Sequence, residues 1–187
     1  RNVNLLRESY IKNLPIIREH FLNDLIHGGV PRDIIPEKLK EYDIDIDNAQ
    51  KWVTAAVHLE PDENVDKALS LHKERELIPI SASNMIEEKL DGQFRFIMFH
   101  SSFESVLIAA IDENNTQTGL VALLGDICKE TKKILEVSVT IGVGEACNSL
   151  ADIGGSFHSA LNALGYRAVA GSGGLIYIRD VEPFNHG

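Results

Sequence analysis

The 187-residue chain has only two cysteines, Cys128 and Cys147, and they lie too far apart for a zinc or redox motif. This scarcity excludes a disulfide-stapled scaffold, and we expect both thiols to act as small hydrophobic side chains in a reducing cytosol. Long apolar runs are also missing, since the longest covers only residues 106–111. A membrane helix needs about 20 apolar residues, so the sequence predicts a cytoplasmic protein without a membrane span.

Basic residues are few, because 18 Lys and Arg stand against 28 Asp and Glu, which gives a net charge of −10. Such a surface repels a phosphate backbone, so we expect no direct contact of this segment with nucleic acid. The content of 44% hydrophobic and 25% charged residues is that of a globular chain with one sizeable core. Because the chain begins with Arg1 rather than Met, we interpret it as a piece of a longer polypeptide.

The motifs of several enzyme classes are missing too. No Gly-Lys-Ser/Thr phosphate loop, His-Glu-x-x-His zinc pair or Gly-x-Ser-x-Gly hydrolase elbow occurs. Asp43, Asp45 and Asp47 have calcium-loop spacing, but the sixth position lacks glycine. The glycines in 171–174 precede a predicted strand, where they favour a turn. We expect no catalytic residue, metal or cofactor. Two alternatives are not excluded by the sequence: a Ser-His-Asp triad assembled from distant segments, and a metal bound by Glu60 together with a second carboxylate on the hairpin.

The first 48 residues are predicted as an N-terminal helical linker segment. Pro15 predicts a kink or a restart in the first helix, Gly28 and Gly29 end it, and a short second helix follows in residues 31–42. One apolar stripe of the first helix recurs at spacings of three and four residues. Its members are Leu6, Tyr10, Leu14, Ile17, Phe21 and Leu25.

Residues 49–182 are predicted as an α+β domain, followed by a tail at 183–187. Its strands are expected at 52–59, 94–99, 105–111, 136–144 and 175–178, and its helices at 66–90, 118–135 and 150–164. Pro79 predicts a break in the first of these helices. The order β-α-β-β-α-β-α-β predicts a mainly antiparallel, ferredoxin-like or nucleotide-cyclase-like sheet with helices packed on one face.

Several segments carry a family resemblance. Residues 141–144 read Ile-Gly-Val-Gly, and residues 156–164 follow the pattern Ser-Phe-x-x-Ala-x-x-Ala-Leu, before Tyr166 and Arg167. This half of the chain resembles the degenerate GGDEF-like domain of PucR/CdaR-type regulators. The opening at residues 14–28 resembles the segment that follows the receiver domain in YesN-like, AraC-type two-component response regulators.

The central hairpin departs from the catalytic members of that group. Diguanylate cyclases carry Gly-Gly-Asp/Glu-Glu-Phe there, with glycines that admit the nucleotide and acids that hold metal. Residues 100–104 of this chain read His-Ser-Ser-Phe-Glu, so the paired glycines are missing and Glu104 is the acid that is left. With Glu60 as the match at the end of the first strand, we expect no two-metal site. The resemblance therefore implies the cyclase fold without cyclase chemistry.

The resemblance implies a non-enzymatic signalling domain that relays receiver phosphorylation to a C-terminal helix-turn-helix domain. Receiver and DNA-binding domains would belong to the same polypeptide, outside this chain. We expect a homodimer, with Leu6, Tyr10, Leu14 and Ile17 as the interface, although the same stripe could pack on its own sheet. The alternative is a domain that senses a small molecule or nucleotide in a remnant of the cyclase cleft. That cleft would contain the residues His58, Glu60 and Glu104.

Overall fold

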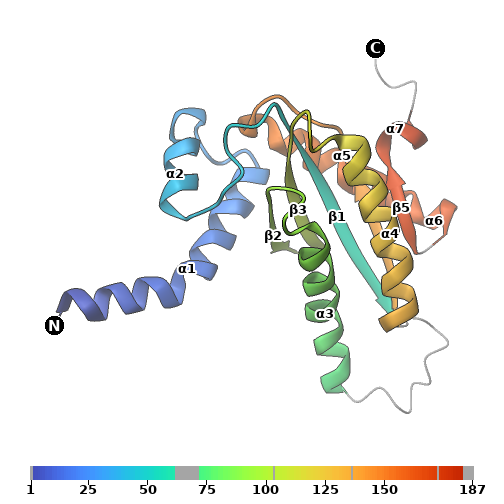
Figure 1. The fold of residues 1–187 in the computed structure, drawn as a ribbon, viewed down its shortest axis with the longest axis horizontal. Helices are drawn as coiled ribbons and strands as arrows, with labels where there is room; N and C mark the ends of the chain where they lie inside the picture. The colour runs from blue at the N-terminus through green and yellow to red at the C-terminus, as the bar shows by residue number, and fades with distance from the viewer. Residues whose placement is uncertain (1, 62–71, 103, 136, 172, 183–187) are drawn as a thin grey trace.

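The computed structural model describes residues 2–61, 72–102, 104–135, 137–171 and 173–182, and Figure 1 shows their arrangement. The strands are β1 (Lys51–Pro61), β2 (Phe96–Ser101), β3 (Glu104–Ile111), β4 (Val137–Val143) and β5 (Gly174–Tyr177). The α-helices are α1 (Asn2–Ile26), α2 (Ile35–Glu41), α3 (His72–Leu90), α4 (Gln117–Leu135), α5 (Ile153–Gly165), α6 (Arg167–Ala170) and α7 (Ile178–Val181). Two short 3-10 helices are η1 (Arg32–Ile34) and η2 (Leu150–Asp152).

The strands form one sheet in the order β2-β3-β1-β4-β5. Three of the strand pairs are antiparallel, and β5 adds to β4 in parallel through the crossover helix α5. The first four strands with α3 and α4 therefore follow the β-α-β-β-α-β plan of the ferredoxin-like fold. The predicted element order and the predicted α+β class are confirmed.

The expectation that the helices cover one face of the sheet is wrong. Helices α3 and α4 pack on one face, whereas α5 and the C-terminal part of α1 pack on the other. The reason lies in the strands, since all residues from Ser105 to Ile111 of β3 are buried. A strand that is apolar on both sides needs cover on both sides. The alternation of Val137, Val139, Ile141 and Val143 in the sequence predicts that β4 has one buried face, but this strand is likewise buried on both.

Gly142 of β4 and Gly144, the first residue after Val143 at its end, set how closely α5 approaches the sheet. A Cβ at Gly142 would lie 2.5 Å from the carbonyl oxygen of Ala160 and 2.6 Å from the amide nitrogen of Leu164. A Cβ at Gly144 would overlap the carbonyl oxygen of Ser156. These glycines therefore serve close packing of helix on strand rather than a turn.

Helix α1 runs through Pro15 without an interruption and changes direction in its middle, in agreement with the predicted kink (Figure 1). It ends where predicted, because Gly28 adopts a φ of +75° and its amide donates to the carbonyl of Leu25. The predicted break at Pro79 is wrong, since α3 is continuous from His72 to Leu90. Its buried Ala82, Ile86 and Leu90 anchor the helix on the sheet, and such packing outweighs local propensity.

Some predicted positions fall elsewhere or outside the description. Ile178 begins α7 instead of ending β5. The start of the predicted helix at 66–71 and the tail at 183–187 lie outside the described residues. In the described part of the chain, every helix is too short or too polar to cross a bilayer.

Candidate functional site: the end of strand β1 and the α1–α2 groove

The β2–β3 hairpin lies at one edge of the sheet, next to the end of β1. Ser101 pairs with Glu104 to close the hairpin, so His100 and Ser101 belong to β2, whereas the predicted strand ended at residue 99. Ser102 in this turn has a φ of +54°, a left-handed conformation that glycine adopts most easily. The hairpin turn therefore has a backbone conformation that usually contains glycine, but serine occupies this position here.

The strand register brings the three predicted cleft residues to one end of the sheet. Val57 of β1 lies opposite Ser105 of β3, so His58 and Glu104 are each one position beyond this pair. Because side chains alternate along a strand, His58, Glu60 and Glu104 point to the face that α5 covers. The sequence alone could not establish this juxtaposition, because it depends on the β1–β3 register.

Glu60 takes part in ion pairs with two neighbouring side chains. Its Oε1 lies 3.4 Å from Nε2 of His58 and 3.5 Å from Nε of Arg167. Arg167 is held in place because its guanidinium also donates to the carbonyl of Leu164, at 3.1 Å. The other ring nitrogen of His58, Nδ1, is buried without a hydrogen-bond partner. The carboxylate at the end of β1 therefore lies beside the His58 ring and the Arg167 guanidinium, with 36% of its side chain exposed.

Arg167 was not predicted as a site residue. It begins α6, two residues after the end of α5, and the C-terminal part of α5 packs against β1 through Ala160 and Leu164. A cation placed just after a helix that crosses the end of β1 could have been matched with Glu60. Within the described ranges, three or more His, Cys, Asp or Glu side chains nowhere converge in a way that could hold a metal ion.

Ser156 and the aspartates with calcium-loop spacing have structural roles in the folded chain. Ser156 is 3% exposed and accepts a hydrogen bond from the amide of Thr54, so it fastens α5 to β1. Asp43 forms an ion pair with Arg18 of α1. Asp45 forms one with Arg95 at the start of the hairpin. These carboxylates tie the α2–β1 connection to its neighbours.

A side-chain hydrogen bond connects α1 to the hairpin, in addition to the apolar contacts of their shared core. Nδ2 of Asn23 donates to the backbone carbonyl of His100, at 2.9 Å, and to the carbonyl of Glu19 within α1. The His100 ring in turn lies 3.3 Å from the Ser105 hydroxyl on β3. A displacement of α1 would thus act directly on β2, close to the hairpin turn.

The predicted interface residues occupy the part of α1 that extends away from the domain. Leu6 is 71% exposed and Tyr10 is 40% exposed. The Tyr10 hydroxyl donates to the carbonyl of Glu41 at 3.3 Å, while Leu14 and Ile17 are half-buried. The stripe therefore begins free of the domain and becomes part of its core at Phe21.

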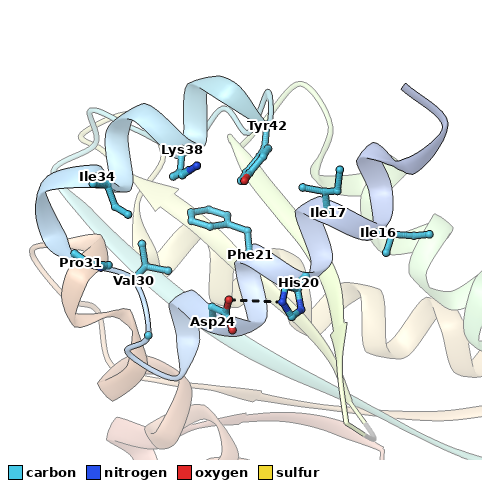
Figure 2. Close-up of a pocket in the computed structure, with 11 residues that line it drawn as sticks. Ile16, Ile17, His20, Phe21, Asp24, Val30, Pro31, Ile34, Lys38 and Tyr42 are labelled. Carbon is cyan, nitrogen blue, oxygen red and sulfur yellow. Dashed lines mark ion pairs between the residues drawn. The ribbon is translucent and has the colours of Figure 1, made fainter. Parts of the chain in front are cut away.

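A groove lies between α1 and α2, and Figure 2 shows its lining. It has a volume of about 500 Å³, in the range of small-ligand sites. Phe21 and Tyr42 stack at a tilt in its middle, with ring centroids 5.4 Å apart. The apolar members of the lining are Ile16, Ile17, Phe21, Val30, Pro31, Ile34 and Tyr42. The polar members include His20 and Asp24, whose Nε2 and Oδ2 atoms are 4.0 Å apart, and Lys38.

The sheet order, the two-sided helix cover and the hairpin next to the end of β1 define an α+β domain of nucleotide-cyclase type. Residues 27–166 match the family described as the GGDEF-like domain. The chain therefore belongs to the GGDEF-like domain family.

One solved structure supports the same fold. It is the crystal structure of diguanylate cyclase SiaD in complex with its activator SiaC from Pseudomonas aeruginosa. The two chains superpose with a TM-score of 0.50 and 14% sequence identity, over 94% of this chain and 69% of that chain. At this identity the likeness establishes the fold alone. No curated protein matches the sequence.

Proposed function

We propose that this domain transmits a signal without catalysing nucleotide cyclisation. In this proposal it is the middle domain of a YesN-like, AraC-type response regulator related to PucR/CdaR-type proteins, with a receiver before it and a helix-turn-helix reader after it. The acidic charge of −10 supports a division of labour in which another domain contacts DNA.

The observation that carries this proposal is the engagement of Glu60. A carboxylate that binds Mg²⁺ in a phosphoryl-transfer site must offer its oxygens to the metal. The Glu60 Oε1 atom lies within 3.5 Å of both His58 and Arg167. The Arg167 guanidinium is always charged, so a divalent cation at Glu60 would meet a positive charge at close range. This arrangement, together with the hairpin sequence at 100–104, favours a structural role for the acid.

The proposed relay starts at α1. Arg18 donates to the carbonyl of Tyr42 at 2.6 Å, and Asn23 donates to His100, so α1 is fastened to both α2 and the hairpin. A receiver that repositions α1 would therefore shift these contacts together. In a homodimer the two copies of α1 would pair in two alternative arrangements, and phosphorylation of the receiver would favour one of them.

The proposed lack of cyclase activity is tested by incubating the chain with GTP and either Mg²⁺ or Mn²⁺, with an active diguanylate cyclase as a positive control. We expect no dinucleotide product from this chain. Metal-dependent product formation that is lost in Glu60→Gln would overturn the proposal. The context is tested by reading the coding sequence on both sides, where we expect a receiver before and a helix-turn-helix domain after.

A further inference from the structure

The N-terminal part of α1 carries large apolar side chains that have no cover within the described residues. Val3, Leu5, Leu6 and Ile11 are 61–73% exposed. At 100° per residue, Val3 and Leu6 lie on the stripe that continues through Tyr10, whereas Leu5 lies on nearly the opposite side of the helix. Val3 and Leu6 therefore form an exposed apolar surface that a partner could cover, and Leu5 provides a control position on the other side of the same helix.

The groove between α1 and α2 is the matching feature. It is lined by apolar side chains of the other end of the same helix, Ile16, Ile17 and Phe21, and by Ile34 and Tyr42 from the segment after it. The first residues of α1 cannot reach the groove of their own chain, because one continuous helix leads away from it (Figure 1). Residues 6 and 20 are about 21 Å apart along this helix.

We infer that a second copy of this chain fills the groove, with the two α1 helices antiparallel, so that the first residues of each helix lie in the α1–α2 groove of the other. This inference rests on the pairing through α1 in the proposed function and adds its direction. A twofold axis near residues 13 and 14 sets Leu6 of one copy beside His20 and Phe21 of the other. The contact is then the same for both copies, as a closed twofold dimer requires.

The sequence of the stripe supports a long helix pair. Its members Val3, Leu6 and Tyr10 recur eleven residues later as Leu14, Ile17 and Phe21. An eleven-residue repeat corresponds to 3.67 residues per turn, which keeps the apolar stripe almost straight along the helix. Both ends of α1 thus present one face to an antiparallel neighbour.

Charge favours the antiparallel direction over the parallel one. Arg7 is four residues after Val3 and lies on the stripe side, while Asp24 lies on the groove with a side chain that is 55% exposed. Antiparallel helices bring Arg7 of one copy toward Asp24 of the other, whereas parallel helices set Arg7 against Arg7. A parallel pair would also leave the groove unfilled.

Cysteine cross-linking tests the direction. In a Cys147→Ser background, chains with Leu6→Cys are mixed with chains with His20→Cys and oxidised gently. We expect disulfides between Cys at 6 and Cys at 20 to dominate, and a mixture of Leu6→Cys with Asn162→Cys, exposed on α5, to give none. Dominant 6–6 disulfides would overturn the antiparallel inference while leaving the pairing of the proposed function intact.

Sedimentation equilibrium tests the pairing itself. We expect a dimer whose dissociation constant rises at least tenfold in Leu6→Asp, with little change in Leu5→Asp, which introduces the same charge on the other side of the helix. A monomer at all concentrations, or equal weakening by both variants, would defeat the inference and the pairing in the proposed function together. Circular dichroism of each variant verifies that the fold is retained.

Discussion

The side-chain amide of Asn23 on α1 donates a 2.9 Å hydrogen bond to the carbonyl of His100 at the end of β2. These residues are 77 positions apart in the sequence, and their contact links the helix that extends from the domain to the hairpin in which cyclases carry their signature. The hairpin, which reads His-Ser-Ser-Phe-Glu over residues 100–104, is thus mechanically connected to α1.

The first prediction concerns this contact. Replacing Asn23 with Ala removes the bond to His100 and should lower the free energy of unfolding by about 1 kcal/mol, the usual net value of such a bond. Hydrogen exchange should accelerate in β2 and β3 more than in α4. Asn162→Ala, at an exposed asparagine of α5, serves as the control. It brings the same gain in helix propensity without loss of a tertiary bond, so it should neither lower the free energy of unfolding nor accelerate exchange in β2 and β3. Equal exchange in the two variants would refute the linkage.

The second prediction concerns the packing of α5 on β4. Gly142→Ala should destabilise the domain by about 1–3 kcal/mol or more, because the new Cβ meets backbone atoms of Ala160 and Leu164 that cannot rotate away. Gly125→Ala is the matched control, since a Cβ at this position in α4 meets nothing within 4 Å. The control should gain up to about 1 kcal/mol from helix propensity. Denaturant unfolding measures both, and a neutral Gly142→Ala would contradict the packing.

The third prediction concerns the two thiols. Burial raises the pKa of Cys128 to about 12 and that of Cys147 to about 11, from an ordinary value of 9.0. At pH 8 about one Cys147 in a thousand is then a thiolate, so the native chain should react slowly with a thiol reagent. Unfolding in denaturant should expose both groups and restore rapid reaction.

The same shifts set a direction for stability against pH. The unfolded chain releases its thiol protons near pH 9, whereas the folded chain holds them to about pH 11–12. Between these values the folded state binds more protons, so the free energy of unfolding should fall as the pH rises above about 9. Cys128→Ala should flatten this decline, and an unchanged slope would exclude Cys128 as its cause.

The fourth prediction separates the relay from nucleotide sensing. If His58, Glu60 and Glu104 form no ligand site, millimolar GTP with Mg²⁺ should leave the melting temperature of the chain unchanged. A specific ligand must raise it, because binding to the folded state alone stabilises that state. A rise that disappears in His58→Ala would establish the sensing alternative instead.

The order of the elements along the chain was predictable because apolar runs and alternation mark each strand directly. The run at 106–111 was predicted as a strand of a hairpin, and the structure buries every one of its six residues. A strand that is apolar on both sides needs cover on both faces, but the ferredoxin-like plan led to an expectation of one covered face. The helices that cover the second face, α1 and α5, belong partly to the segment that the sequence presented as a linker.

The predicted site was harder to obtain from the sequence, because its members meet only through tertiary structure. His58 and Glu60 were found from their place at the end of a strand. Arg167, the cation that pairs with Glu60, lies more than a hundred residues later, and only the expected crossing of the last long helix over the end of β1 could have connected the two. Pro79 illustrates a different failure. A local rule predicted a helix break there, but the packing of the helix on the sheet overrides that rule.

Strand β1 lies in the middle of the sheet between β3 and β4, which come at least 40 residues later in the chain. During translation, both hydrogen-bonding edges of β1 would stay unsatisfied until Ile111 has been synthesised, and the edge that pairs with β4 until Val143 has been synthesised. In that interval the nascent chain exposes an aggregation-prone strand, which makes it a substrate for chaperone capture.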